Sequence, residues 1–157
     1  MAVKIGAKAI TTHPGLIHRY EDRVKNLGRQ YSIETLTKAN EYGEERGVIF
    51  SIENMPNKYA YYCTSAEEHT LFTQECGCHA TVDIGHANTK GDINSFIAMK
   101  NIYYYHLSDN NGDKDQHLAL GEGNLDLKLI NGIDKVILEL DDYQNVLNSR
   151  KILLSQL

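Results

Sequence analysis

The sequence has no tryptophan, only two prolines and three cysteines, and no long hydrophobic run. Without about 20 consecutive apolar residues, we do not expect the chain to cross a membrane. Cys63, Cys76 and Cys78 are an odd number without a paired framework, which predicts reduced thiols. The first residues also lack the apolar core of a signal peptide. Together these absences predict a cytoplasmic protein.

Basic residues are outnumbered by acidic ones. The chain has 16 Lys and Arg against 21 Asp and Glu, a formal net charge of −5. The sequence contains no run of Lys and Arg residues of the kind that binds polyanions. Nucleic acid is therefore disfavoured as a partner. The 157 residues, 41% of them hydrophobic, suffice for one domain with a buried core. We therefore expect residues 1–157 to form a single domain.

Five short apolar runs each end in a residue that can bind a metal. Helical segments alternate with them, which predicts a parallel sheet covered by helices. Such a sheet collects its chemistry at the carboxyl ends of its strands. The pattern therefore predicts a metal-dependent active site. The pairs of strand and ligand are 7–12 with His13, 48–52 with Glu53, 80–82 with Asp83, 102–105 with His106, and 136–138 with Glu139.

The segments between the strands carry helix signals. Ser32 is a suitable N-cap for a helix that stops near Gly47, and Thr64-Ser65-Ala66-Glu67 resembles a capping box. Three shorter helices are expected over 93–99, 125–130 and 143–154. The long irregular segment 107–124 is predicted to be functional, because such loops are uncommon in compact domains.

Two clusters hold several candidate ligands each. Asp115 and His117 would lie on the same side of an extended loop, where they suit zinc, manganese or a similar ion. The alternative is a solvated loop with Asp-Gly turns. In Asp83-Ile84-Gly85-His86, Gly85 lets the backbone turn between two candidate ligands. The alternative there is that Asp83 caps the next segment.

The other strand-end residues stand more alone. Glu53 and Glu139 need a partner after an apolar strand, and either a metal or a basic side chain would serve. Two carboxylates on one metal can also exchange a proton on a substrate carbon. His13 precedes a Pro-Gly turn, which equally fits a structural role. We expect Tyr103, Tyr104 and Tyr105 to pack within the strand. The remaining histidines are predicted to be surface or supporting residues: His18, His69 and His79.

These motifs resemble the xylose-isomerase-like TIM-barrel superfamily, which contains sugar isomerases and epimerases together with endonuclease IV, of AP endonuclease family 2. The motifs follow one another along the chain in the same order as in that family, and they span nearly the whole chain. The matching motifs are His13-Pro14-Gly15, Glu53-Asn54, Asp83-x-x-His86, His106-Leu107-Ser108-Asp109, Asp115-x-His117 with Gly121-Glu122-Gly123, and Glu139.

The resemblance implies roles for these residues. Glu53, Asp83, His106 and Glu139 would form the metal centre, with Glu53 and Glu139 as the acid/base pair. His86 and Asn54 would contact the substrate. In the nuclease-like arrangement, a further zinc would be held by His86, Asp115 and His117, and His13 would complete a separate zinc site.

The resemblance also implies a departure from the family. A complete barrel has eight strands and about 250 residues, whereas we count five strands. About three N-terminal βα units are missing, and with them one zinc-binding histidine of the nuclease. We therefore predict a partial TIM (β/α) barrel with helices on its outer face. Its open edges could support self-association.

The predicted function is a divalent-metal-dependent sugar or sugar-phosphate isomerase or epimerase. Zinc or manganese is the expected ion, with magnesium or cobalt as alternatives. The second hypothesis is an endonuclease IV-like zinc phosphodiesterase acting on abasic DNA. Asp115-x-His117 favours it, and the lack of Lys/Arg runs and the missing histidine disfavour it. The third is a catalytically incomplete barrel fragment that needs a partner.

Overall fold

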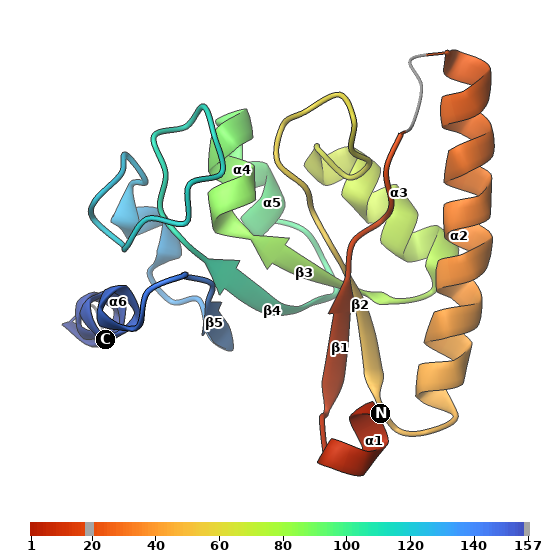
Figure 1. Ribbon diagram of the computed structural model, residues 1–157, viewed down its shortest axis with the longest axis horizontal. Coiled ribbons are helices and arrows are strands. Elements are labelled where there is room, and N and C mark those ends of the chain that lie inside the picture. The colour runs from red at the N-terminus through yellow and green to blue at the C-terminus, as the bar shows by residue number, and fades with distance from the viewer. Residues whose placement is uncertain (18–20, 156–157) are drawn as a thin grey trace.

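A computed structural model describes residues 1–17 and 21–155, and within these ranges five parallel strands form one curled sheet (Figure 1). The strands follow each other in the sheet in the same order as in the chain, so each neighbouring pair is joined by a crossover. This half-barrel confirms the predicted partial TIM barrel. The strands are β1 (Ala9–Thr12), β2 (Ile49–Glu53), β3 (His79–Asp83), β4 (Ile102–Leu107) and β5 (Val136–Leu138).

The helices lie between the strands much as the sequence predicts. They are α1 (Ala2–Ile5), α2 (Asp22–Glu44), α3 (Ala66–Cys76), α4 (Ile84–Lys90), α5 (Ile93–Ile97), a 3-10 turn η1 (Leu127–Ile130) and α6 (Tyr143–Ser155). The expected N-cap at Ser32 is wrong, because α2 already begins at Asp22. Ser32 lies inside that helix, and its hydroxyl donates to the carbonyl of Pro14 in the loop after β1.

The capping box of α3 lies one residue later than predicted. Ser65 is the N-cap, and its hydroxyl accepts from the backbone N–H of Glu68 at 3.2 Å. The Glu68 carboxylate in turn accepts from the backbone N–H of Thr64 at 3.3 Å. One backbone donor of the first turn and one just before the N-cap are thus satisfied, which stabilises the start of the helix.

The core lies between the sheet and its helices in two clusters. In the first, Phe50 and Ile52 of β2 pack with Phe72 of α3. In the second, Val82 of β3 packs with Phe96 of α5. Burying each such large side chain contributes about 1.5–3 kcal/mol. This packing fixes the strands and hence the positions of the residues at their carboxyl ends.

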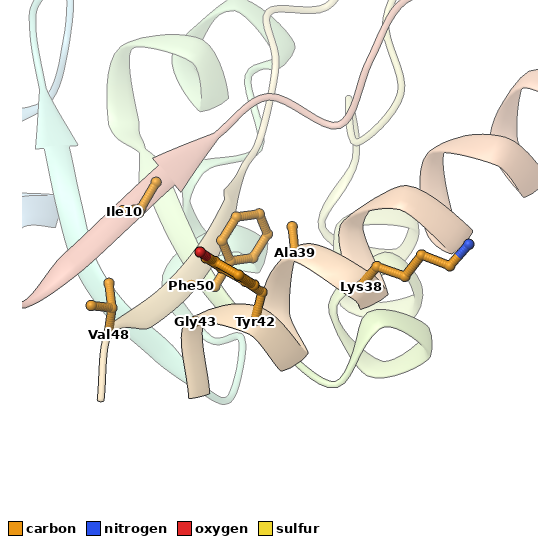
Figure 2. Close-up of a pocket in the computed structure, with 7 residues that line it drawn as sticks. All are labelled: Ile10, Lys38, Ala39, Tyr42, Gly43, Val48 and Phe50. Carbon is orange, nitrogen blue, oxygen red and sulfur yellow. The ribbon is translucent and has the colours of Figure 1, made fainter. Parts of the chain in front are cut away.

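Both outer strands of the sheet, β1 and β5, have one edge without a strand partner in the described ranges. Beside β1, a groove of about 470 Å³ lies between the sheet and α2 (Figure 2). Ile10 and Tyr42 line it and are 40% and 61% exposed. This surface could support the predicted self-association, which stays a prediction.

The sequence predicts reduced thiols and no segment that crosses a membrane. Cys63, Cys76 and Cys78 are all free and buried. Among residues 1–17 and 21–155, no helix combines the length and apolarity that crossing a bilayer requires. His18 lies outside the described residues.

Candidate metal centre

Four of the predicted ligands meet at the carboxyl ends of the strands. One potential ligand atom from each lies within 4.8 Å of the others, and the four residues are Glu53, Asp83, His106 and Glu139. The Nδ1 atom of His106 lies 2.7 Å from Oε1 of Glu53 and 2.8 Å from Oε2 of Glu139. Because one ring nitrogen carries at most one hydrogen, it can donate to only one of these carboxylates. We call these four residues the strand-end cluster.

Oδ2 of Asp83 is buried without a hydrogen-bond partner among the described residues. Oε2 of Glu139 is also buried, and it competes with Glu53 for the single hydrogen on Nδ1 of His106, so it is left without a donor when that hydrogen bonds to Glu53. Oδ1 of Asp83 is used differently, since it accepts from the backbone N–H of His86 at 2.6 Å and caps α4. The capping and metal-ligand readings of Asp83 are therefore compatible, with one oxygen for each. Buried anionic oxygens without a donor are costly, and a divalent cation would satisfy them.

The cluster strongly shifts the pKa values of its members. Burial raises the pKa of Glu53, but hydrogen bonds from His106 and His13 outweigh it and lower the pKa to about 2. Burial lowers the pKa of His106, but the Glu139 and Glu53 carboxylates raise it to about 10. Burial raises the pKa of Asp83 to about 6. Without a metal, the imidazolium of His106 therefore supplies the positive charge between two carboxylates.

His13 approaches the strand-end cluster from its edge. It follows β1, and its Nε2 atom lies 3.5 Å from Oε2 of Glu53. Its side chain is 64% exposed, whereas that of Glu53 is 4% exposed. His13 thus contacts one predicted ligand, but it does not belong to either group of potential ligands that converge within 4.8 Å.

A second convergent group consists of His86, Asp115 and His117, which we call the loop cluster. Oδ2 of Asp115 lies 3.1 Å from Nε2 of His86 and 3.2 Å from Nε2 of His117. The Nδ1 atoms of the two histidines donate to backbone carbonyls, those of Asn54 and Glu139, at 2.8 Å each. Metal-binding histidines commonly use their second nitrogen in this way. Oδ1 of Asp115 is buried without a partner among the described residues.

The loop that carries Asp115 and His117 is organised by Asp109, a residue whose role the sequence reasoning missed. The fully buried carboxylate of Asp109 accepts backbone N–H groups at 2.8–3.1 Å from Asn110, Gly121, Gly123 and Leu125. A signal was available, because the Gly-Glu-Gly stretch 121–123 supplies backbone that can approach closely. A Cβ atom at Gly123 would lie only 2.4 Å from Oδ1 of Asp109.

The loop is not extended around His117, contrary to the prediction. His117 has φ +48°, in the left-handed region that most residues avoid. Asp109 and Leu118 pair in an antiparallel bridge through two backbone hydrogen bonds of 2.9 Å. The bridge and the Asp109 carboxylate, rather than strand-like alternation, bring His117 toward Asp115.

A layer of hydroxyl groups lies in the sheet next to the strand-end residues, and the sequence analysis did not predict it. Oγ of Ser51 and Oγ1 of Thr81 lie 2.8 Å apart, and Thr11 bonds to both of them and to Tyr104. Each member stands two residues before a strand-end ligand, so it shares that ligand's face of the strand. Tyr104 also stacks on His106 at 5.6 Å between centroids, beyond the strand packing expected of it.

His69 and Asn54 are both fully buried. Nε2 of His69 lies 2.8 Å from the carbonyl oxygen of Ile52, beside Glu53, which excludes a surface position. Burial lowers the pKa of His69 to about 4. Both polar atoms of the Asn54 side chain are bonded to the backbone of Asp83, so they do not face an open substrate site.

The family described as xylose isomerase-like TIM barrel matches residues 1–143. The uncharacterized protein MJ1614 of Methanocaldococcus jannaschii is 32% identical over 98% of this chain. A second uncharacterized protein of that organism, MJ1311, is 30% identical over 97% of it. The chain spans only 64% and 57% of the lengths of these two relatives.

Solved structures show the same fold. A D-tagatose 3-epimerase-like protein has a TM-score of 0.84 and 28% identity, and the match covers 99% of this chain and 64% of that one. The IOLI protein, solved with a bound zinc atom, has a TM-score of 0.78 and 20% identity, with the same coverage. At 20% identity, the second match supports the fold alone.

Proposed function

The chain belongs to the xylose isomerase-like TIM barrel family, and we propose that it is a divalent-metal-dependent isomerase or epimerase of a sugar or sugar phosphate. The observation that carries this proposal is the placement of Glu53 and Glu139 around one nitrogen of His106, at 2.7 and 2.8 Å. Two carboxylates at one centre can serve a substrate carbon from two sides. The likeness to a D-tagatose 3-epimerase-like protein supports a small sugar as the substrate.

The residues present fit a divalent ion. Oδ2 of Asp83 is buried without a donor among the described residues, and Glu53 and Glu139 compete for one hydrogen of His106. With the ring nitrogen of His106, these oxygens form a mixed donor set that suits zinc or manganese. Glu53, Asp83, His106 and Glu139 would hold the ion. When bound, it would polarise a substrate carbonyl and so acidify the neighbouring C–H group.

Proton transfer falls to the two glutamates. One carboxylate takes the proton from the carbon beside the carbonyl, and the other, in its protonated form, returns a proton to the same carbon or its neighbour. Glu53 is held rigidly by His106 and His13, whereas the Glu139 side chain is 44% exposed and has room to move. Glu139 is therefore the better candidate for exchanging its proton with solvent. In this proposal His86 contacts substrate from the loop cluster.

A second candidate is a zinc phosphodiesterase that cleaves abasic DNA. The loop cluster favours it, because His86, Asp115 and His117 could hold a further ion and Asp115 has one buried oxygen without a partner among the described residues. Several ions close together can activate water and stabilise a leaving oxygen. The net charge of −5 disfavours it, since phosphates require positive partners.

The third candidate is a half-barrel that needs a partner polypeptide for turnover. It rests on the edges of β1 and β5 that have no strand partner in the described part of the chain, and on the fact that the chain spans 64% of the length of the relative MJ1614. A monodisperse monomer that turns over substrate would rule it out.

One experiment separates the first two candidates. The protein is loaded with zinc or manganese, dialysed, and its metal content measured by mass spectrometry. It is then incubated in D2O with D-tagatose, D-fructose and their phosphates, and deuterium at the carbon beside the carbonyl is followed by NMR. We expect about one ion in the strand-end cluster and deuterium incorporation. Cleavage of an abasic oligonucleotide without any sugar exchange would overturn the proposal.

A further inference from the structure

Asn54 connects the two clusters through its side chain and its backbone. Its side-chain Nδ2 donates to the carbonyl of Asp83 at 2.9 Å, and its Oδ1 accepts from the N–H of Asp83 at 2.7 Å. The amide thus bonds to both backbone groups of a single residue, as a neighbouring strand would. It extends the pairing of β2 with β3 just beyond Glu53.

The backbone carbonyl of Asn54 acts on the other cluster. It accepts from Nδ1 of His86 at 2.8 Å, which leaves Nε2 of that ring facing Asp115 at 3.1 Å. Asp83 closes the connection, because its Oδ1 accepts from the backbone N–H of His86 at 2.6 Å. Asn54, Asp83 and His86 are therefore joined in a ring of four hydrogen bonds.

We infer that Asn54 is a positioning residue that holds Asp83 of the strand-end cluster and His86 of the loop cluster in one frame. The inference rests on the proposed function insofar as the clusters bind metal. Asn54 is fully buried with its side-chain amide engaged on both sides, so it acts through its neighbours and does not touch substrate.

The chemistry of the site calls for an amide at this position. A carboxylate would keep the acceptor for the Asp83 N–H but lose the donor to the Asp83 carbonyl. It would also place a further negative charge beside a cluster that already holds three carboxylates. A leucine of similar volume would leave the backbone N–H of Asp83 without its acceptor and would remove the side-chain donor to the Asp83 carbonyl. Either loss frees Asp83 to shift away from the other ligands.

The chain offers a matched control in Asn40. This asparagine is also buried, at 6% exposure, and its Nδ2 donates to the carbonyl of Gly77 at 3.2 Å, outside both clusters. Asn40→Leu and Asn54→Leu each remove a buried side-chain donor to a backbone carbonyl without adding a charge. Asn40→Ala and Asn54→Ala repeat the comparison with a smaller side chain, in case leucine does not fit.

The experiment compares these variants in metal binding and in spectra of the site. Zinc affinity is measured against a competing chelator, the visible spectrum of the cobalt-loaded protein reports on its coordination, and nitrogen-15 NMR reports on the His86 ring. We expect the Asn54 variants to bind zinc 10- to 100-fold more weakly, with changed cobalt bands and a changed His86 signal. The Asn40 variants should lose stability alone.

The outcomes separate this inference from the proposed function. If Asn54 variants bind zinc as tightly as Asn40 variants, with the same cobalt spectrum and His86 signal, Asn54 is not a positioning residue. If the unaltered protein binds no divalent ion, the proposed function fails. The His86 signal then decides the inference by itself, because the hydrogen bond to the Asn54 carbonyl exists without metal. A His86 signal that changes equally in both sets of variants would also overturn it.

Discussion

The ring of His117 donates from Nδ1 to the backbone carbonyl of Glu139 at 2.8 Å. The bond joins the long loop after β4 to the residue that follows β5, across 22 positions of the chain. Because Glu139 is in the strand-end cluster and His117 in the loop cluster, the two clusters are in contact here as well as at Asn54.

Neutralising either glutamate of the strand-end cluster should abolish proton exchange. Glu53→Gln and Glu139→Gln each remove a base while keeping the side-chain size, and we expect deuterium incorporation to fall about 100-fold or more. The measurement is the NMR assay in D2O. Glu67→Gln, at an exposed position of α3, is the control and should retain full activity. Activity that survives in both cluster variants would place the reaction elsewhere.

Metal binding should release protons and strengthen as the pH rises. The carboxylates around His106 raise its pKa to about 10, so in the metal-free protein it is protonated at pH 7.5 and must lose its proton to act as a ligand. Below the pKa of His106, the need to remove this proton should make the apparent affinity for zinc rise up to tenfold for each unit by which the pH is raised. Calorimetric titration with zinc in two buffers of different ionisation enthalpy measures the released protons. A heat that is the same in both buffers would contradict the prediction.

Removing the Asp109 carboxylate should disorganise the loop cluster. Its oxygens accept four backbone N–H groups, and Asp109→Ala would leave those donors buried without it. We expect a loss of about 3 kcal/mol or more in the free energy of unfolding, measured in urea. Asp113→Ala, at an exposed position of the same loop, should have little effect. A stable Asp109→Ala variant with an unchanged His117 NMR signal would refute this role.

A positive charge on the exposed edge of β1 should reduce self-association. Ile10 is 40% exposed beside an apolar groove, and a lysine there opposes edge-to-edge pairing. We expect Ile10→Lys to lower the concentration-dependent sedimentation coefficient. Ile137→Lys makes the same change on β5, where Ile137 is 48% exposed, and shows which edge associates. Equal sedimentation of the unaltered protein at all concentrations would mean that neither edge associates.

Local patterns were sufficient for the strands and their order. Apolar runs such as 48–52 and 102–105 predicted β2 and β4 within two residues at either end, because buried parallel strands need continuous apolar residues. The sequence does not mark the start of α2 at Asp22, because Glu21 before it makes no side-chain cap bond and Gly28 interrupts the helical pattern before Ile33. The sequence predicts a turn at Gly85 where the structure has the helix α4. Gly85 weakens the helical pattern, although Asp83 caps the helix.

The sequence by itself determined the fold class and the candidate ligands. Strand ends in a parallel sheet share one edge, so His, Asp and Glu at those positions must come near each other. The resemblance already implied the two groups of ligands, and only the tertiary structure decided which contacts hold each group in place, because those contacts join residues far apart in the chain. The ring through Asn54, Asp83 and His86 and the Asp109 carboxylate are such contacts. Hydrogen bonds of this kind have no periodicity, so the side-chain types alone do not reveal them.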